Sequence, residues 1–598
     1  MTIHPSLDLA VIGNGNLSAL VDRSGAIVWM CWPRVDGDPL FCALIDGEKP
    51  EDGFFSIVFD DEKGETEQSY VRNSAIVRTI VRSESGAAFS ITDFAPRFHR
   101  HDRLFNPPTI VRVLEPLSGL CRIRIRLRPR MAYGSLRPTP VMGSNHVRFA
   151  ADGGGSIRLS TDAPVSYVAT EGAFVLSRRM TLILHPDEPM SDSIPRVGRE
   201  FQDRTLDSWH TWVRHLNLPF EWQEQVIRAA ITLQLCSFEQ TGAIVAALTT
   251  SMPEAPREQR NWDYRYCWIR DAYFTVLALN RVGASVTMER FIDYVTNIIS
   301  MEGGSNMRPV YAILPESDLE ERVAPDLAGY RGYGPVRIGN DAVNQVQHDV
   351  YGSVILAASQ MFFDERLPKK GDEHLFAMLE PLGMRALAVA LTTDAGIWEY
   401  RDKPSIHTYS AAMCWVACDR LARIATRLGL QERAEQWRKS ADGLRNEILV
   451  RAWNAKLKVF TGSLDSDHID ASVLLLAELG LVKADDPKFV STVEVIGDVL
   501  ARNGYLFRYA APDDFGAPST AFTICSFWYV EALAAIGRPE EARVLFEKIL
   551  ARRNHVGLLS EDIDPVTGEL WGNFPQTYSL VGIILCAMRL SKSWEVAR

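Results

Sequence analysis

The spacing of apolar residues changes near residue 195 and divides the sequence into two parts. Before this point, short β-branched and aromatic runs such as 54–59 and 89–94 are separated by Gly, Asp, Asn and Pro. This pattern is typical of short antiparallel strands joined by turns, and it predicts a sandwich. From about residue 200 the apolar positions recur with the period of amphipathic helices. We therefore expect a strand-rich domain that ends near 195 and a helical domain that begins near 220.

Twelve helical segments can be placed in the second part of the sequence. Residues that favour helix ends support several of them, because Gly537 is suited to end one helix and Pro539 to begin the next. Twelve helices with almost no strands predict six helical hairpins, arranged as a ring of six inner and six outer helices. The expected spans are 222–239, 269–283, 285–301, 341–362, 373–392, 409–428, 431–450, 466–482, 486–501, 520–536, 539–553 and 576–593.

Loops rich in Trp, Tyr, Arg and carboxylates precede several of the even-numbered helices in this count. In an alternating ring such loops would converge at one end, and loops gathered on a rigid scaffold commonly carry function. The loops are 261–271, 334–340, 396–401 and, before the last helix, 560–565 with 572–576.

Charge and cysteine content narrow the possible partners and location. The net charge is −11 and the pI about 5.7, which argues against nucleic acid, because phosphate binding needs a basic face. The basic run 122–130 is interpreted as a strand with one solvated face. No apolar stretch reaches the length of a membrane span. The nine cysteines, an odd number without a Cys-x-x-Cys pair, and the lack of a signal-peptide pattern lead us to expect buried, reduced thiols and a cytoplasmic location.

Aromatic residues beside carboxylates and arginines are typical of sugar-binding sites. Glycoside hydrolysis needs two carboxyl groups, one protonated and one ionised. Glu399 lies between Trp398 and Tyr400, and apolar neighbours disfavour the charged form, which suits a general acid. The alternative is a surface glutamate stabilised by the dipole of the following helix.

Glu561 is the candidate for the second carboxyl group. Its neighbours Asp562 and Asp564 suggest a wetter site, suited to a base that activates water. The alternative is a solvated acidic turn, because Asp-Pro is common in turns. Similarly, the adjacent Arg270 and Asp271 could either hold a sugar or form an ion pair that caps a helix.

Other chemistries have weaker support in the sequence. His348, His407 and His468 are isolated, with no His-x-x-x-His pair or cysteine cluster around them, so a metal site is not expected. The Gly-x-Ser-x-Gly motif of serine hydrolases is absent from the sequence. We therefore expect neither a metal nor a cofactor.

Six motifs along the chain resemble glycoside hydrolase family 15, which contains glucoamylases, glucodextranases and a bacterial trehalase branch. The segments 12–14 and 25–29 also look like the N-terminal domain of its bacterial members. The six motifs are 261–271, 335–340, 396–399, 413–415, 525–528 and 572–576.

The resemblance implies an N-terminal antiparallel β-sandwich over 1–195, a linker helix region over 196–221 and an (α/α)6 barrel over 222–598. It also implies inversion at the anomeric carbon, release of β-glucose from the non-reducing end, and no cofactor. By motif position, Glu399 matches the general acid and Glu561 the general base.

Other positions match the family's sugar-binding residues. Arg270 and Asp271 match the pair that holds the 4- and 6-hydroxyls of the non-reducing glucose. Tyr264 matches a tyrosine that helps to hold the nucleophilic water. Trp268 and Trp398 match walls of the first sugar subsite.

The sequence departs from the family at a few positions. Tyr409 and Ala411 stand where many bacterial relatives have His and Lys, Leu580 where many have His, and Ser519 where Glu is frequent. The catalytic carboxylates are retained, so the departures bear on specificity.

Three functions from two classes remain open at this stage. The leading hypothesis is hydrolysis of a small intracellular α-glucoside, with trehalose as the first candidate. The enzyme alternative is a glucoamylase or isomaltose-type glucosidase acting on maltodextrin or isomalto-oligosaccharide ends. The alternative from another class is a non-catalytic glucan-binding protein.

Overall fold

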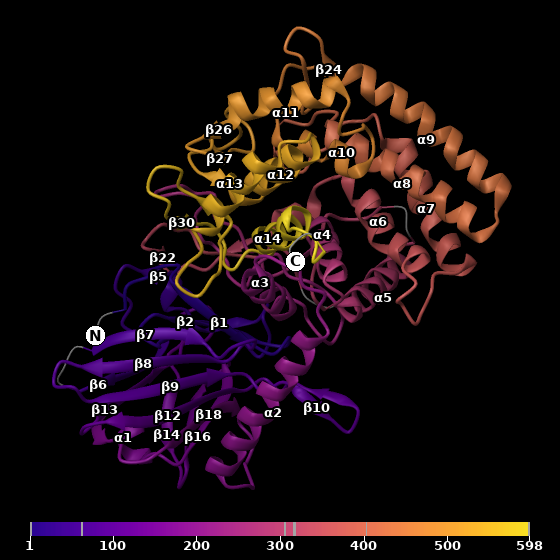
Figure 1. The fold of residues 1–598 in the computed structure, drawn as a ribbon. Helices are drawn as coiled ribbons and strands as arrows, with labels where there is room; N and C mark the ends of the chain where they lie inside the picture. Colours follow the sequence, from indigo (N-terminus) through magenta and orange to yellow (C-terminus); the bar gives the residue numbers. More distant parts are fainter. Residues whose placement is uncertain (1–2, 61–63, 304–305, 315–317, 402, 596–598) are drawn as a thin grey trace.

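The computed structural model describes residues 3–60, 64–303, 306–314, 318–401 and 403–595. The first part of the chain forms two antiparallel sheets that share one core, so the predicted strand-rich domain is confirmed (Figure 1). One sheet has the order β1-β2-β3-β6-β13-β17, with β4 paired to β3, and the other has the order β14-β15-β16-β18-β12-β9-β8-β7. The strands are β1 (Leu9–Gly13), β2 (Ser18–Asp22), β3 (Ile27–Trp32), β4 (Asp38–Phe41), β6 (Phe54–Phe59), β7 (Gly64–Tyr70), β8 (Val77–Ser83), β9 (Ala88–Phe94), β12 (Ile110–Ser118), β13 (Arg122–Arg128), β14 (Thr139–Met142), β15 (His146–Ala151), β16 (Gly155–Thr161), β17 (Ala173–Val175) and β18 (Met180–Pro186).

Alternation along the strands decides which side chains enter the sandwich core. On β13, Ile123, Ile125 and Leu127 are buried, and the arginines between them point the other way. Successive side chains of a strand face opposite sides of the sheet. The arginines at 122, 124, 126 and 128 therefore share one face of β13, as their alternation predicts, while Arg130 lies after the strand and is buried.

Arg112 on β12 ties the two sheets together inside the sandwich. Its fully buried guanidinium forms a bidentate ion pair with Asp93 on β9, at 2.8 and 3.0 Å. It also donates to the backbone carbonyls of Phe55, at 2.6 Å, and Gly25 in the opposite sheet. Because a buried charge is costly unless it is paired and hydrogen-bonded, these contacts specify how the sheets face each other.

A long helix, α2 (Ile194–Arg214), follows the last strand of the sandwich. Its Ile194 and Val197 pack with Phe94, Val111 and Ile183 of the larger sheet. These strand residues alternate with the ones that enter the sandwich core, so α2 covers the outer face of that sheet.

The second part of the chain forms a double ring of helices (Figure 1). Contacts join α4 to α6, α6 to α8, α8 to α10, α12 to α14, and α14 back to α4, while the odd-numbered helices pack outside them. The expected alternation of inner and outer helices is therefore confirmed. In the described residues of this part the α-helices are α3 (Gln223–Leu235), α4 (Ile269–Arg281), α5 (Ser285–Glu302), α6 (Asp349–Phe363), α7 (Glu373–Val389), α8 (Thr408–Leu428), α9 (Gln431–Arg451), α10 (Leu476–Leu479), α11 (Pro487–Leu500), α12 (Thr523–Ala535), α13 (Pro539–Leu550) and α14 (Thr577–Leu590).

Two inner helices are shorter than their sequence pattern suggests. The expected helix 341–362 begins as a 3-10 turn, and Gln345 is extended before α6 starts. The expected helix 466–482 is reduced to a 3-10 segment, η3 (Ala471–Leu475), followed by α10. In both cases a side chain, Asn340 or Asp470, caps the start of the 3-10 turn by accepting a backbone N–H two residues on.

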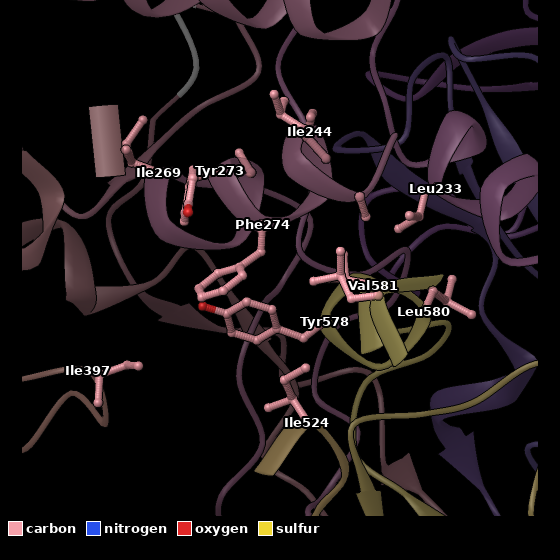
Figure 2. Close-up of a cluster of buried hydrophobic side chains, with 14 of the residues drawn as sticks. Leu233, Ile244, Ile269, Tyr273, Phe274, Ile397, Ile524, Tyr578, Leu580 and Val581 are labelled. Carbon is pink, nitrogen blue, oxygen red and sulfur yellow. The ribbon is translucent and has the colours of Figure 1, made fainter. Parts of the chain in front are cut away.

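Large apolar side chains fill the interior of the inner ring. Figure 2 shows Phe274 of α4 against Tyr578 of α14, and their ring centroids are 5.3 Å apart. Leu233 of α3 and Val581 of α14 belong to the same buried cluster. This packing joins neighbouring inner helices to each other and to the outer helix beside them.

The two domains are joined by backbone contacts as well as by side chains. In the sandwich domain, β5 (Asp46–Gly47) pairs in parallel with β22 (Gly329–Tyr330) of the helical domain. The indole Nε1 of Trp29 donates to the carbonyl of Leu248 at 2.8 Å. The sandwich therefore lies against the loops of the barrel, and α2 is not the sole connection.

All nine cysteines are buried and unpaired. Burial raises the pKa of Cys31 to about 12, so this thiol stays protonated at neutral pH. None of the helices in the described residues has both the length and the apolar character that crossing a membrane requires.

Candidate active site

One pocket opens at the end of the barrel where the inner helices begin. Its lining comes from the loops that precede α4, α6, α8, α12 and α14, so the expected convergence of loops is confirmed. The pocket has about 900 Å³ of space, part of it open to solvent, which is within the size range of small-molecule sites. It brings together all seven residues singled out in the sequence, namely Tyr264, Trp268, Arg270, Asp271, Trp398, Glu399 and Glu561.

The sequence interpretation missed two loops of the same kind. The loop before α12 supplies Arg508, Asp513 and Phe515 to the pocket. The loop before α10 supplies Asp470, which lies outside the lining but accepts a hydrogen bond from Trp398 Nε1 at 2.7 Å and so orients that indole. The rule that loops before even-numbered helices converge would have found both, although their local composition is less distinctive.

Glu399 sits in a tight turn with an unusual backbone conformation. Its φ is 61°, in the left-handed region that non-glycine residues rarely adopt. Gly396 of the same turn has a φ of 68°, and a Cβ there would lie 2.6 Å from the ring of His407. Such strained conformations persist when the surroundings over-determine them, and they cluster at functional sites.

The Glu399 carboxyl is surrounded by hydrogen-bond donors. Trp268 Nε1 donates to its Oε1 at 2.7 Å, and Arg270 Nη2 lies 3.3 Å from the same oxygen. The expectation of apolar surroundings from Trp398 and Tyr400 was therefore wrong. Of its neighbours in sequence, Tyr400 stacks its ring on His407 and Trp398 donates its indole N–H to Asp470.

Glu561 is the more buried of the two carboxyl groups. It is 2% exposed, and the expectation of a wetter site was also wrong. Burial raises the pKa of the Glu561 carboxyl, and the negative charge of Glu254 raises this pKa further. The Tyr264 hydroxyl donates to Glu561 and opposes the shift. The backbone N–H of Asn573 also donates to its Oε2, at 3.3 Å.

Arg270 and Asp271 lie in the first turn of α4 and face the pocket. Their mutual approach, 3.9 Å, is loose. Arg270 Nη1 instead contacts Gln347 at 2.8 Å and Asp349 at 3.3 Å. Burial raises the pKa of Asp271 to about 7, although Arg270 lowers it. Arg270 is thus held at the pocket by more than a helix-capping ion pair.

A second group of buried charges, which the sequence interpretation missed, lies beside Glu561. Glu254 and Arg508 form an ion pair and both line the pocket. The carbonyl of Glu254 accepts a hydrogen bond from Thr520 at 3.0 Å, and Thr520 also donates to Asp562. Glu254 was overlooked because its loop, 250–258, shows no aromatic or acidic cluster.

Several buried polar atoms of the pocket residues have no hydrogen-bond partner within the described part of the chain. They include Nε of Arg270 and of Arg508 and the hydroxyls of Tyr400 and Tyr578. Buried polar atoms almost always have partners, so these groups are suited to the hydroxyls of a bound sugar. Across the described ranges, no group of three or more His, Cys, Asp or Glu is arranged to hold a metal ion.

The four departures from the family motifs lie outside the pocket lining. Ala411 and Leu580 are fully buried in the helical core, where Figure 2 shows Leu580 on α14. Tyr409 is buried on α8, close enough for the charge of Asp349 to raise the pKa of its hydroxyl beyond the effect of burial. Ser519 donates to Glu258 at 2.6 Å. These four positions therefore contact the packing around the site and not the pocket itself.

A ring of helices that gathers paired carboxyls, arginines and aromatic rings in one pocket defines the class of glycoside hydrolases. Residues 222–588 match the protein family described as "Glycosyl hydrolases family 15", and residues 4–169 match the family described as "Trehalase-like, N-terminal". The chain therefore belongs to glycosyl hydrolase family 15 and is a hydrolase with a carbohydrate substrate.

Individual proteins are similar over nearly the whole chain. A trehalase of Thermoplasma volcanium is 31% identical, covering 97% of this chain and 93% of its own length. A trehalase of Mycobacterium tuberculosis is 29% identical, covering 99% and 90%. A crystal structure of a bacterial glucoamylase in complex with acarbose has a TM-score of 0.72 at 14% identity, covering 99% and 95%. That structural likeness confirms the fold, a β-sheet domain followed by an (α/α)6 barrel.

Substituting Gly572 with alanine tests how tightly the pocket fixes Glu561. Gly572 has a φ of 76°, and a Cβ there would lie 2.6 Å from Cβ of Glu561 and 2.8 Å from its Oε2. We expect Gly572→Ala to lower kcat/KM for sugar hydrolysis by at least about tenfold, because displacing a reacting group by about 1 Å can cost about a hundredfold.

The matched control is Gly537→Ala. Gly537 has a φ of 86° and nothing within 4 Å of the added Cβ, so this variant suffers the backbone strain without a clash. It should lose stability and keep its activity. Equal activity of the two variants would show that Gly572 does not hold Glu561 in place.

Proposed function

We propose that the chain is an inverting, exo-acting α-glucosidase that releases β-glucose from the non-reducing end of a small α-glucoside, with trehalose as the first candidate. The observation that carries the proposal is the pair of carboxyls in one pocket, Glu399 and Glu561, each bonded by a side chain of the same short segment. Similarity over the full length to proteins named trehalase, and the match to a trehalase-like N-terminal domain, favour trehalose.

Glu399 is proposed as the general acid. Both donors, Trp268 Nε1 and Arg270 Nη2, contact its Oε1. Because Oε1 is occupied by these donors, Oε2 is proposed as the oxygen that carries the proton to the glycosidic oxygen. The strained backbone of Glu399 then serves to aim this oxygen into the pocket.

Glu561 is proposed as the general base that activates water. A raised pKa makes its carboxylate a stronger base, while the bonds from Tyr264 and from the N–H of Asn573 still stabilise the ionised form. Tyr264, which lines the pocket, is positioned to hold the water that Glu561 deprotonates.

Arg270, Asp271 and the unpartnered hydroxyl of Tyr578 are proposed to hold the non-reducing glucose. Charged donors and acceptors bind sugar hydroxyls with directional hydrogen bonds. Trp268 and Trp398 supply aromatic walls for the apolar faces of the ring. A sugar held by its terminal hydroxyls is cleaved from the end of the chain, which accounts for exo action.

The second candidate is a glucoamylase or isomaltose-type glucosidase, favoured by the shared fold with a bacterial glucoamylase. A panel of trehalose, maltose, isomaltose and starch separates the two by glucose release. We expect kcat/KM to be highest on trehalose, by at least about tenfold, the discrimination that one or two well-placed contacts give. Faster hydrolysis of maltose or isomaltose would replace trehalose by the second candidate.

Proton NMR of the first-formed products tests inversion on trehalose. Inversion at one anomeric carbon yields one β-glucose, while the departing glucose keeps its α configuration, so the two anomers should appear in equal amounts. A retaining enzyme would release α-glucose alone at early times, and that result would exclude the proposed pair of roles.

Two glutamine variants test the roles of the carboxyls. Glu399→Gln should lower kcat on trehalose by about a hundredfold or more, the typical contribution of general acid catalysis. Hydrolysis of α-glucosyl fluoride should be partly spared, because fluoride leaves without protonation. Glu561→Gln should impair both substrates. Glu569→Gln, which removes a partly exposed carboxyl paired with Arg331, is the control, and equal losses on both substrates in Glu399→Gln would contradict its role.

The pH profile tests the charge of Glu254. Activity needs Glu561 ionised, so kcat/KM should fall as pH drops through the raised pKa of Glu561. Glu254→Gln removes the negative charge that raises this pKa, so the acidic limb should move to lower pH. Glu258→Gln removes a nearby carboxyl whose charge is not among the main causes of the raised pKa of Glu561. The acidic limb of the pH profile of this variant should therefore stay where it is in the wild-type enzyme. A shift to higher pH in Glu254→Gln would contradict the assignment of the limb.

A further inference from the structure

The segment 261–268 presents its side chains alternately to two different surroundings. Trp262, Tyr264 and Trp268 line the pocket. The side chains at the odd positions 261, 263, 265 and 267 are fully buried, each with 0% exposure, and they lie outside this lining, as does Tyr266. Alternation of this kind is a property of extended chain. The segment therefore has one face toward the substrate and one toward the body of the protein.

The pocket face of this segment contacts both carboxyls of the proposed mechanism. The Tyr264 hydroxyl donates to Glu561, and Trp268 Nε1 donates to Glu399 at 2.7 Å. A shift of the segment would therefore disturb the proposed base and the proposed acid together. What holds the opposite face in place then determines how well the two carboxyls are aligned.

Arg265 anchors the opposite face on the sandwich domain. Its guanidinium is fully buried and forms two hydrogen bonds with Asp263, at 2.9 and 2.7 Å. It crosses the domain boundary to donate to the carbonyl of Gly37 at 2.7 Å and to the hydroxyl of Tyr133 at 3.3 Å. The planar fork of arginine serves several acceptors at once, which the single ammonium of lysine cannot reproduce.

The sandwich domain holds its side of this contact in a fixed shape. Ala132 and Tyr133 both have left-handed backbones, with φ values of 49° and 51°. The carboxylate of Asp38 accepts the backbone N–H groups of both residues, at 2.6 Å for Tyr133. A strained turn of this kind persists only when its surroundings fix it, so Asp38 keeps the Tyr133 hydroxyl in position for Arg265.

We propose that the sandwich domain is part of the catalytic unit, and that Arg265 and Tyr133 are positioning residues that align the segment carrying Tyr264 and Trp268. The proposal rests on the roles given above to Glu399 and Glu561. Neither positioning residue lines the pocket. Their effect on hydrolysis passes through the segment, across the boundary between the domains.

The test compares two variants at this contact with one elsewhere on the domain boundary. Tyr133→Phe removes only the hydroxyl that Arg265 contacts, and Arg265→Lys removes the fork. The control is Tyr70→Phe. The hydroxyl of Tyr70 bonds to the backbone of Val11, and its ring stacks under Arg228 of the barrel, 3.3 Å from the guanidinium. It is also a domain-boundary tyrosine, but it lies outside the pocket lining.

We expect Tyr133→Phe to lower kcat on the best substrate of the panel about 3- to 10-fold, the effect of one neutral hydrogen bond. Arg265→Lys should lower it about 10- to 100-fold, with KM changed less than kcat. Tyr70→Phe should lower the melting temperature and keep kcat within about twofold. If Arg265→Lys fails to fold, Tyr133→Phe still decides the outcome.

The pH profile separates positioning from a loss of stability. Tyr264 lowers the pKa of Glu561 through its hydrogen bond, so loosening the segment should move the acidic limb of kcat/KM to higher pH in both variants. A lower melting temperature with unchanged kcat and unchanged limb would overturn the proposal. Wild-type enzyme without turnover on any α-glucoside would instead overturn the proposed function, which the same assay reveals first.

Discussion

The balance of buried charge in the pocket is the constraint on which the rest of the site depends. Arg270 lies 3.3 Å from both Asp349 and Glu399, and Arg508 pairs with Glu254 elsewhere in the lining. An unpaired buried charge costs several kcal/mol, so each arginine fixes where its carboxyls can lie. The same arginines keep donors free for a ligand, because each retains a buried Nε without a partner in the described residues.

The double ring makes this balance possible by bringing several helix starts to one place. Asp271 and Asp349 occupy the first turns of α4 and α6. The N-terminus of a helix carries partial positive charge, which stabilises a carboxylate nearby. Inner helices that all begin at the pocket thus supply both the loops and part of the field that buried acids need. The outer helices carry no pocket residues, and their role is to hold the inner ring together.

Periodicity and motif position were enough to predict the two domains, the inner ring and seven residues of the pocket, but not Glu254 or Arg508. They could not predict the environment of the two carboxyl groups. Glu399 was expected among apolar rings and Glu561 in a wet turn, yet the first is surrounded by donors and the second is 2% exposed. Both environments include residues more than 100 positions away, such as Trp268 for Glu399 and Tyr264 for Glu561. The helix expected at 466–482 was predicted too long, because it starts at Asp470, whose side chain caps a 3-10 segment, and α10 ends at Leu479.

The domain boundary explains why the sandwich is more than an attached module. The barrel segment 246–251 pairs with the segment 261–268 through backbone hydrogen bonds, such as the one that Ala247 N–H donates to the Tyr264 carbonyl at 3.0 Å. This barrel segment in turn receives the indole of Trp29 at the Leu248 carbonyl. Arg265 lies in the segment 261–268, and its guanidinium donates to the Gly37 carbonyl of the sandwich. A barrel without the sandwich would leave a carbonyl and a guanidinium beside the pocket residues Tyr264 and Trp268 with fewer partners, and unsatisfied groups of this kind favour rearrangement. The two domains therefore complete one site between them.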